Sequence, residues 1–554
     1  MVKLFKRTIS LFSRQQTDIL SAAGVLMTAV FLSRVLGLVR DRLLAGRFPP
    51  EELGVYYAAF RLPNMIFELL VMGALATAFI PVFTTMTDTK GKQDAFGMAS
   101  SVINIGLIIF GILSFPIIIF TKEISILLAP GFSESQINLM VSFTRIMIIA
   151  QVFPLIIGNF LTGILQSFRN FLIPALAPVL YNLGIIIAIL ILTPAIGLYA
   201  PVIGVVLGAI LFTIVQIPLV ISLGFRHKWK YSLSDPGTRA VGRLMLPRTL
   251  GLAVSQIDTT VDLVLSTLLG AGAVTIFSFA QHLAQLPVGL FGASIAQASL
   301  PSLSSNFAKG SRQEFKKIFL SSYHQIIFLV VPISAVLIVL RIPMVRLVFG
   351  ASNLFDWEST VLTGKTVAFF GISLFAQALV HLLARSFYAL HDSKTPVIIG
   401  ACSVVINASL SILLILYYHL PVWSLGLSAS IASIFNMILL IFFLDKKVGF
   451  FNRYELFIPT LKIFLAGAVS GIALYIPIKL LDQLVFDTTR TLNLLVLTGI
   501  SAVVGLSVYF FLAWFLEVPQ VGILSKLATR ARGLRRGMVM DTTAEVVNVP
   551  ESEI

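Results

Sequence analysis

The chain has 554 residues, of which 57% are hydrophobic and 12% are charged, and its mean hydropathy is +0.96. Soluble domains carry roughly 25% charged residues, so this composition excludes a water-soluble fold. The formal net charge of +15 would point to nucleic acid in a soluble protein. Most lysines and arginines lie in short loops between apolar runs, so we expect no nucleic-acid partner.

Apolar runs long enough to cross a bilayer recur from Ile19 to Leu516. A helix needs about 20 residues to span a hydrocarbon core of ~30 Å. The ~10-residue alternation of polar and apolar residues that marks membrane β-barrels is absent, so the sequence predicts an all-α membrane protein. Residues 1–17 lead into the first run without a small-residue cleavage site, so we predict no removable signal peptide.

Breaks at glycine, proline and charge clusters divide the chain into fourteen predicted spans. They lie near residues 19–46, 54–85, 95–120, 137–167, 172–194, 199–223, 249–270, 273–307, 318–341, 361–390, 395–418, 421–445, 456–481 and 491–516. Lysine and arginine gather in the loops after the even-numbered spans. The positive-inside rule therefore predicts that these loops and both termini are cytoplasmic.

The sequence repeats itself weakly at a shift of about 220 residues. Residues 76–81, ATAFIP, correspond to residues 296–301, AQASLP, and each is followed by a pair of serines or threonines. A six-helix unit that repeats in this way keeps its orientation in the membrane.

We therefore predict two six-helix lobes in parallel repeat, over residues 1–223 (spans 1–6) and 224–445 (spans 7–12). Spans 13 and 14, over 446–520, are added outside the repeat, and 521–554 is predicted to be a disordered cytoplasmic tail. Two parallel lobes place a cavity on their pseudo-twofold axis and suit transport by alternating access.

Span 1 carries four charged residues, Arg34, Arg40, Asp41 and Arg42. A charge in the middle of a membrane helix costs about 2.5 to 3.5 kcal/mol, so each must face a cavity, a partner or the interface. Arg34 and Arg40 lie roughly 240° apart on an ideal helix, so they share a face only if the helix bends, which Gly37 permits. Three arginines against one carboxylate leave cations for an anionic ligand such as phosphate.

Span 2 adds Arg61 and, seven residues later on the same face, Glu68. One interpretation pairs Arg40 with Asp41, or Arg61 with Glu68, as structural salt bridges near the interface. The other gives the first lobe a basic cavity wall, and we favour it because arginines outnumber carboxylates in span 1.

Span 7 carries Asp258 and Asp262 one helical turn apart, while His282 lies in span 8 and Asn407 in span 11. Two carboxylates on one face can hold Na⁺ or pass a proton, and a polar contact between helices is the alternative. The single cysteine, Cys402, is expected to be a small buried apolar residue. We recognise no enzyme motif and no nucleotide-binding domain, so we expect a transporter driven by an ion gradient, the membrane potential or a partner.

Six motifs, in this order and spacing, resemble the MurJ (MviN) lipid II flippase family of the multidrug/oligosaccharidyl-lipid/polysaccharide exporter superfamily. They are residues 31–41 (FLSRVLGLVRD), 60–64 (FRLPN), 129–132 (APGF), 163–178 (GILQSFRNFLIPALAP), 300–304 (LPSLS) and 387–396 (FYALHDSKTP). The resemblance runs from about residue 19 to 516.

The resemblance implies a flippase, not an enzyme, that carries the undecaprenyl-pyrophosphate-linked peptidoglycan precursor lipid II. Transport would run from the inner to the outer leaflet of the bacterial cytoplasmic membrane, for cell-wall assembly. The expected partners are this lipid-linked anion and membrane lipids, with the last two helices holding the lipid tail, and we expect a monomer. No cofactor is expected other than Na⁺ as a coupling ion.

Carried over by position, the resemblance implies substrate-binding roles for Arg34, Arg40, Asp41 and Arg61. It also implies a Na⁺ site at Asp262 and Asn407. The sequence departs from the family at three positions. Where the family has two cavity arginines, this chain has Phe67 and His282, and we keep His282 as a substrate-binding residue. Where the family has the second acid of its sodium site, this chain has Ser411.

Two alternatives remain open. A cation-coupled multidrug or polysaccharide-lipid exporter of the same superfamily would favour acidic residues in the first lobe, which here is basic. A membrane scaffold that transports nothing would use the tail after Lys526 to bind its partner.

Overall fold

The structure is a computed structural model that describes residues 19–72, 78–350, 352–481 and 491–522, and the regular structure in these ranges is helical. The predicted all-α membrane fold is confirmed. The chain divides into two compact units. The first unit comprises Met1–Leu286, Arg341–Phe370 and Lys394–Asn436; the second comprises Pro287–Leu340, Gly371–Ser393 and Met437–Ile554. The predicted tail from residue 523 onward lies outside the described residues.

The first unit holds the helices from α2 to α14, together with α17 and α19. Their bounds are α2 Ile19–Ala45, α3 Pro50–Ala59, α4 Arg61–Phe67, η1 Glu68–Met72, α5 Ile80–Lys90, α6 Lys92–Ile119, α7 Thr121–Leu128, α8 Glu134–Ile146, η3 Met147–Val152, α9 Phe153–Ser167, α10 Leu172–Ile196, α11 Tyr199–Ile214, α12 Ile217–Ser222, α13 Pro236–Leu268, α14 Ala271–Pro287, α17 Arg341–Phe349, α19 Lys394–Ile412 and η5 Leu413–Tyr417. The segments labelled η are π-helical.

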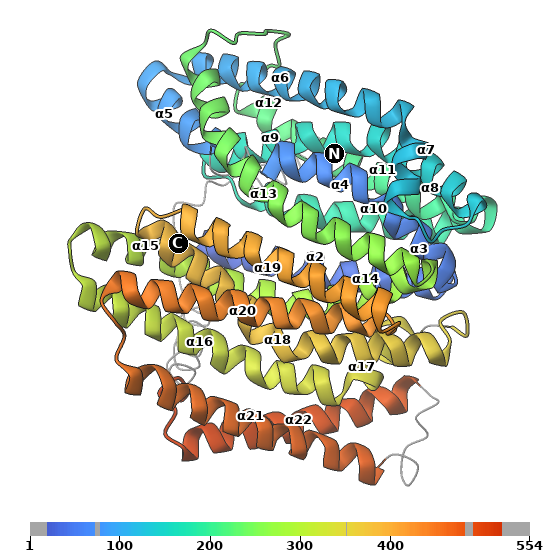
Figure 1. The fold of residues 1–554 in the computed structure, drawn as a ribbon. Coiled ribbons are helices and arrows are strands. Elements are labelled where there is room, and N and C mark those ends of the chain that lie inside the picture. Colours follow the sequence, from blue (N-terminus) through green and yellow to red (C-terminus); the bar gives the residue numbers. More distant parts are fainter. Residues whose placement is uncertain (1–18, 73–77, 351, 482–490, 523–554) are drawn as a thin grey trace, which may run out of the picture. The chain divides into compact units, whose positions relative to one another are not determined.

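The second unit holds η4, α15, α16, α21 and α22, while α18 and α20 contribute to both units. Their bounds are η4 Val288–Ala293, α15 Ser294–Ala308, α16 Arg312–Val339, α18 Trp357–Ala389, α20 Trp423–Val448, α21 Arg453–Leu481 and α22 Thr491–Phe515. Within this unit α21 packs along α22 and α16 (Figure 1).

Eleven helical stretches of the described chain are long and apolar enough to cross a membrane. They fall on predicted spans 3 to 6 and 8 to 14. Predicted spans 1, 2 and 7 fall on α2, on the interrupted stretch from α3 to α5, and on α13, and these carry the charged residues of the candidate site. The count of fourteen spans stays a prediction.

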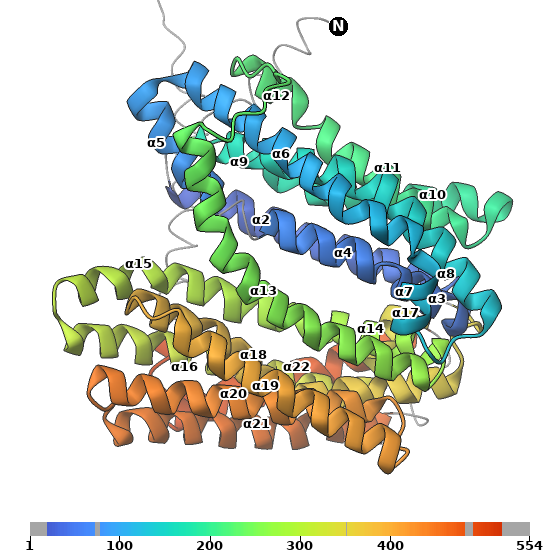
Figure 2. The same cartoon turned by 45° about the horizontal axis from the view of Figure 1, so that its top comes forward.

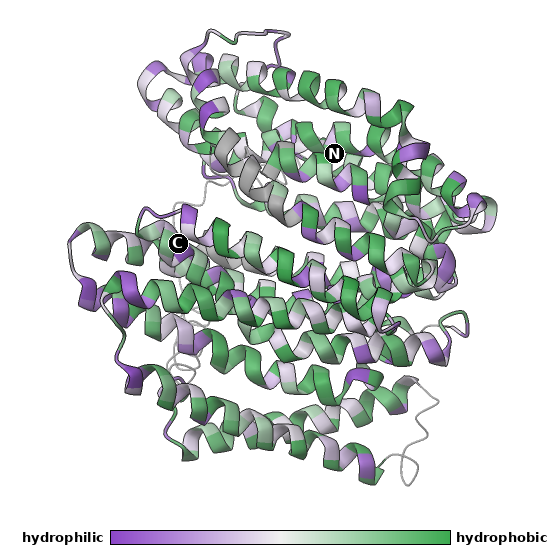
Figure 3. Ribbon diagram, viewed as in Figure 1, coloured by the Kyte–Doolittle hydropathy of each residue, from purple (hydrophilic) through white to green (hydrophobic). Residues whose placement is uncertain are grey.

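The outer surface is that of a protein surrounded by lipid. Figure 3 shows hydrophobic residues along the helices and hydrophilic ones mainly at helix ends and loops. Large apolar side chains such as Leu127, Phe115 and Phe515 are more than half exposed, which water would disfavour. The expectation of a buried Cys402 is wrong, because this side chain is exposed on α19. In lipid an outward-facing thiol is still in apolar surroundings.

The shift of about 220 residues recurs in the helix bounds. The 28-residue helices α6 and α16 begin at Lys92 and Arg312, and the helices that follow them, α7 and α17, begin at Thr121 and Arg341. The starts of these helices thus keep the spacing of the weak sequence repeat, and the parallel repeat of two lobes stays a prediction. The lobe boundaries at residues 223 and 445 stay predictions.

Glycines allow α10 and α11 to approach closely, which fixes the helix that supports the site. A Cβ built on Gly184 would lie 2.7 Å from the Cα of Gly208, and one on Gly208 would lie 2.4 Å from the carbonyl oxygen of Tyr181. Small residues at such crossings are the usual means of helix association in membranes. The other side of α10 packs on α2, so α10 is held between two neighbours.

Gly131 of the APGF motif makes a similar contact with the end of α13. A Cβ at this position would lie 1.9 Å from the carbonyl oxygen of Thr267, so backbone must shift to admit a methyl group. We expect Gly131→Ala to lower the midpoint of thermal unfolding in detergent, at a cost of about 1 to 3 kcal/mol. The control is Gly111→Ala in α6, where a Cβ meets no atom within 4 Å. Equal midpoints for the two variants would contradict this account of the motif.

Candidate functional site

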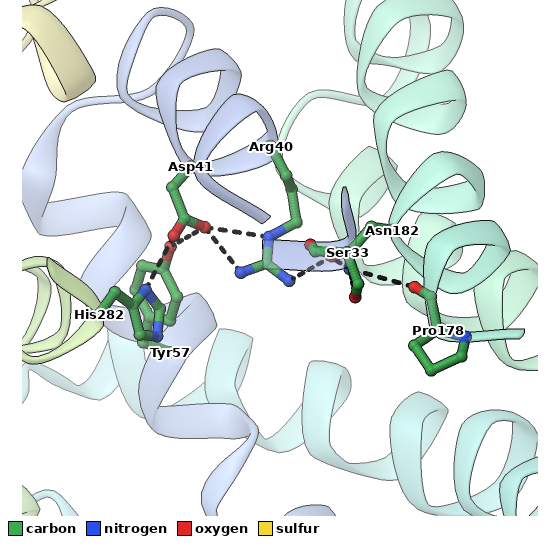
Figure 4. A network of polar contacts seen from close by, with 7 residues as sticks. All are labelled: Ser33, Arg40, Asp41, Tyr57, Pro178, Asn182 and His282. Carbon is green, nitrogen blue, oxygen red and sulfur yellow. Dashed lines mark hydrogen bonds and ion pairs between the residues drawn. The ribbon is translucent and has the colours of Figure 1, made fainter. Parts of the chain in front are cut away.

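Arg40 and Asp41, near the end of α2, form the centre of a polar network (Figure 4). The Nε and Nη2 atoms of Arg40 lie 3.0 and 2.8 Å from Oδ1 of Asp41. Nη1 of Arg40 donates to Oδ1 of Asn182 at 3.2 Å. The amide of Asn182 in turn donates to Ser33 and to the carbonyl oxygen of Pro178. The network therefore joins α2 to α10 and fixes the direction of the Arg40 guanidinium.

Asp41 is also bound from the opposite side by His282 of α14. Nδ1 of His282 lies 2.8 Å from Oδ2 of Asp41, and the Tyr57 hydroxyl donates to Oδ1 at 3.4 Å. Only 2% of the Asp41 side chain is exposed, against 37% for His282. A buried carboxylate needs such partners, since an unpaired charge inside the protein is costly. With Nδ1 occupied, Nε2 of His282 is left to face a ligand.

These residues border a cavity of about 310 Å³ that lies within the first unit. Its described lining is basic, hydroxylic and aromatic and contains no carboxylate. The lining residues are Arg40, Tyr56, Tyr57, Phe60, Arg61, Asn64, Tyr181, Thr259, Leu263, Ser266, Val274, Phe277, Ser278, Gln281 and His282. The predicted residues Arg40, Arg61 and His282 therefore line one cavity. Asp41 is outside its lining and bonds to Arg40 and His282.

Arg61 opens α4, directly after a break in the helical segment at Phe60. Pro63 has no backbone N–H, so the carbonyl of Ala59 four residues earlier has no helical partner there. That carbonyl accepts a hydrogen bond from the Thr144 hydroxyl of α8 instead, at 3.2 Å. The FRLPN motif thus separates α3 from α4 and lets Tyr57 and Arg61 face the same cavity.

Of the two ion pairs in the alternative interpretation, Arg40–Asp41 forms, whereas Arg61 is held by α13 and does not pair with Glu68. Its Nε donates to the Thr260 hydroxyl at 2.9 Å, and Nη2 donates to the carbonyl oxygen of Gln256. The Gln256 side-chain amide donates to Glu68, so in the described chain a glutamine lies between the two charges. The arginine is therefore oriented without a carboxylate bound directly to it.

The other arginines of span 1 lie elsewhere. Arg34 is exposed, and the described residues offer it no polar partner or place in the cavity lining. Arg42 donates to the carbonyl oxygen of Leu347 in α17. Helix α2 runs without interruption from Ile19 to Ala45, so Arg34 and Arg40 keep different faces. Phe67, where the family has an arginine, packs on an apolar cluster formed by Leu155, Ala177, Ala209 and Phe212.

A second polar cluster joins α13 to α19. The side-chain amide of Asn407 donates to Oδ1 of Asp258 at 2.9 Å and to Oδ1 of Asp262 at 3.2 Å. Asp262 and Asn407 are 5% and 2% exposed, and Oδ1 of Asn407 has no hydrogen-bond partner in the described chain. Ser411 is not part of this cluster, because its hydroxyl bonds to Ser428. The second carboxylate of this cluster therefore comes from Asp258, and residue 411 takes no part in it.

Asn182 and Tyr57 were not singled out from the sequence, yet both bind the charged pair. A polar residue in an otherwise apolar membrane helix usually faces the protein interior, so Asn182 carried a usable signal. Tyr57 carried one too, because it lies one helical turn before Arg61 and so shares its face.

The family model described as Lipid II flippase MurJ matches residues 53–495 of this chain. The protein belongs to the lipid II flippase MurJ family. This confirms the resemblance that the six motifs predicted.

Two relatives show how far the similarity extends. A probable lipid II flippase MurJ of Bdellovibrio bacteriovorus is 27% identical and aligns over 91% of this chain and 96% of its own length. The lipid II flippase MurJ of Burkholderia cenocepacia is 29% identical over 75% of this chain and 82% of its own.

The solved structures describe the fold. A lipid II flippase MurJ in an inward closed conformation matches with a TM-score of 0.72 at 24% identity, covering 88% of this chain and 98% of that one. An inward-facing multidrug resistance transporter of the MATE family matches with a TM-score of 0.63 at 16% identity, covering 75% and 94%. The fold is therefore shared between MurJ and MATE transporters, and the site must distinguish their substrates.

Proposed function

We propose that this protein is a lipid II flippase that carries the undecaprenyl-pyrophosphate-linked peptidoglycan precursor from the inner to the outer leaflet by alternating access. The observation that carries the proposal is the cavity that Arg40, Arg61 and His282 line without a carboxylate among its described residues. Membership of the MurJ family supports the same substrate.

The chemistry of the cavity suits a diphosphate joined to sugars. Guanidinium groups donate paired hydrogen bonds to phosphate oxygens. Arg40 keeps its plane because Asp41 and Asn182 hold it, and Arg61 is held by backbone and hydroxyl oxygens of α13. Preorganised cations lose little conformational freedom when the anion binds. Amide and hydroxyl groups among the lining residues can pair with sugar hydroxyls.

The chain is a multi-pass membrane protein of a flippase family. We propose that it acts as a monomer without catalysing a reaction, and that both termini are cytoplasmic. The charge of the loops after even-numbered spans supports this topology.

We further propose that Na⁺ binds between α13 and α19 as the coupling ion. Hard cations are bound by oxygen atoms, and the cluster offers the carboxylates of Asp258 and Asp262 with the unpaired Oδ1 of Asn407. Two buried acids on one membrane helix are costly unless a cation or proton compensates them. The ion gradient would then supply the energy for transport.

The deciding experiment measures translocation by the purified protein in lipid vesicles. A fluorescent lipid II analogue should cross to the opposite leaflet, whereas a cationic dye should not be transported by the same preparation. The reverse result would assign the protein to the multidrug exporters that share its fold. A protein that moves neither substrate but still supports cell-wall synthesis would support the scaffold alternative.

A further inference from the structure

A second basic cavity lies in the first unit. The cavity around Arg40, Arg61 and His282 is called the transport cavity below. The second cavity has a volume of about 280 Å³ and is lined by residues from the start of α6 and from the loop that joins α12 to α13. Figure 2 shows this loop passing near the start of α6. Its lining residues are Gln93, Phe96, Gly97, Gly224, Arg226 and Lys228. No residue of this set belongs to the transport cavity or to the Asp258–Asn407 cluster.

The loop is fixed against α6 by two buried polar side chains. The Asn104 amide donates to the carbonyl oxygens of Lys228 and Lys230 at 2.9 and 3.1 Å. The Ser100 hydroxyl accepts from the backbone N–H of Lys228 at 3.3 Å. Ser100 and Asn104 are 0% and 1% exposed. Polar groups are costly to bury in a membrane helix. Their hydrogen bonds to the loop backbone therefore indicate that the fold holds this loop in a fixed position.

Basic and aromatic side chains alternate along this loop. Arg226 and Lys228 line the cavity. The residues between and beside them form a row of rings, with centroids 6.5 Å apart for Phe225 and His227 and 5.3 Å apart for His227 and Trp229. Partial burial lowers the pKa of His227 below its ordinary value of about 6.5, so its ring is neutral near pH 7. The cavity charge therefore comes from Arg226 and Lys228.

The floor of the cavity is built from residues that leave space. A Cβ added to Gly97 would meet no atom within 4 Å, and Gly224 has a φ of +98°, which favours glycine. Phe96 closes the inner wall by packing on Phe225, with ring centroids 5.5 Å apart. Among the described residues the lining contains no acid. A space with two cations and an uncrowded floor can admit an anionic group.

The position of the loop indicates where that anion comes from. The loop follows the apolar stretch Tyr199–Ser222 and contacts the first half of the apolar helix Lys92–Ile119, from Phe96 to Asn104. Because it leaves one membrane helix and runs along the N-terminal half of another, we infer that it lies in the interfacial region. Trp229 and Tyr231 are 75% and 58% exposed, as aromatic residues at a membrane interface are. Basic pockets at the ends of membrane helices bind the headgroups of anionic lipids.

We propose that this cavity binds the phosphate headgroup of an anionic membrane phospholipid, with Arg226 and Lys228 contacting the phosphate oxygens. The aromatic row lies at the level of the headgroups, and the glycine floor admits the phosphate. The site is separate from the transport cavity and does not rest on the proposed flippase activity.

The test uses Trp229 as its reporter. The full chain has four tryptophans, and Trp357, Trp423 and Trp514 are replaced by phenylalanine so that only Trp229 fluoresces. The protein is placed in phosphatidylcholine vesicles that contain equal small fractions of either brominated phosphatidylglycerol or brominated phosphatidylcholine. Bromine quenches a nearby tryptophan, so we expect stronger quenching by phosphatidylglycerol.

The variants separate local binding from general charge. Arg226→Gln with Lys228→Gln should remove the preference, a loss of about tenfold or more in relative affinity for two cations. Gly97→Leu should also reduce it by filling the cavity while the charges stay. The matched control, Lys309→Gln with Lys317→Gln, removes the same charge from the end of α15 and the start of α16, and it should keep the preference.

Other results would overturn the proposal. Equal quenching by the two lipids, or a preference that survives both cavity variants, would show that no headgroup site exists here. Displacement by millimolar inorganic phosphate would assign the cavity to free phosphate, and displacement by a small amount of lipid II would assign it to the substrate. The doubly neutralised variant should still translocate lipid II in phosphatidylcholine vesicles, so failure of the headgroup site and failure of the flippase proposal are distinguishable.

Discussion

Arg40→Ala is expected to abolish complementation of a flippase-depleted bacterium. The variant removes a guanidinium from the cavity wall and leaves the buried Asp41 with His282 and Tyr57 as its partners. A hydrogen bond to a charged group contributes about 1.5 to 3 kcal/mol, and breaking a buried ion pair costs about 3 to 5 kcal/mol. Complementation is scored together with the amount of protein in the membrane. Arg40→Lys should rescue only partly, because ammonium keeps the charge but not the planar fork.

A second variant separates loss of binding from loss of stability. Arg40→Ala combined with Asp41→Asn also removes the buried negative charge that has lost its arginine, so thermal stability in detergent should recover while complementation should not. Arg145→Ala is the control, since Arg145 bonds to Ile118 and Thr121 outside the cavity and should be dispensable for transport. If Arg40→Ala complements fully at normal membrane levels, the anion cavity is wrong and the multidrug alternative becomes the better one.

Asp262→Asn is expected to remove the stimulation of transport by Na⁺. The carboxylate is almost fully buried and lies on the same helix as Asp258, with Asn407 bonded to both. Losing its charge removes the deeper anionic ligand of the proposed ion. Translocation of a lipid II analogue between the two leaflets of the vesicle membrane is measured with Na⁺ and with an impermeant organic cation at equal ionic strength.

The neighbouring positions provide graded controls. Asp258→Asn should weaken the apparent affinity for Na⁺ by about tenfold or more, as expected for loss of one charged ligand. Ser411→Ala should leave it unchanged, because that hydroxyl bonds to Ser428 and not to the acids. Unaltered Na⁺ dependence in Asp262→Asn, or a larger effect at Ser411 than at Asp258, would refute the site.

The positions of Asp258 and Ser411 compare two kinds of sequence reasoning. Helical spacing paired Asp258 with Asp262 on one face of span 7, whereas the resemblance implied that the second acid falls at Ser411. In the structure Asp258 and Asp262 both bond to the amide of Asn407, and Ser411 bonds to Ser428 instead. Spacing therefore identified the two acids that lie together, and the packing of α13 on α19 shows that Asn407 joins them.

The sequence by itself determined the all-helical membrane fold, because 57% hydrophobic residues in long runs leave no other way to satisfy the backbone in lipid. It also determined the family, through six motifs whose order is specific, and it placed Arg40, Arg61 and His282 among the candidates. Composition and span length suffice for the fold, whereas the family and the site role of His282 rest on the resemblance that the motifs carry.

Only the tertiary structure decided which charges face a common space. Arg34 and Arg40 are equally charged on one helix, yet of the two only Arg40 lines the cavity, because in the continuous helix α2 they point to different faces. Arg61 is bound by α13 and not by Glu68. Arg40 and His282 are 242 residues apart in the sequence, yet both bind Asp41. Such pairings depend on how helices cross, and helix crossing is fixed by close contacts such as Gly184 on Gly208, whose geometry a linear pattern does not contain.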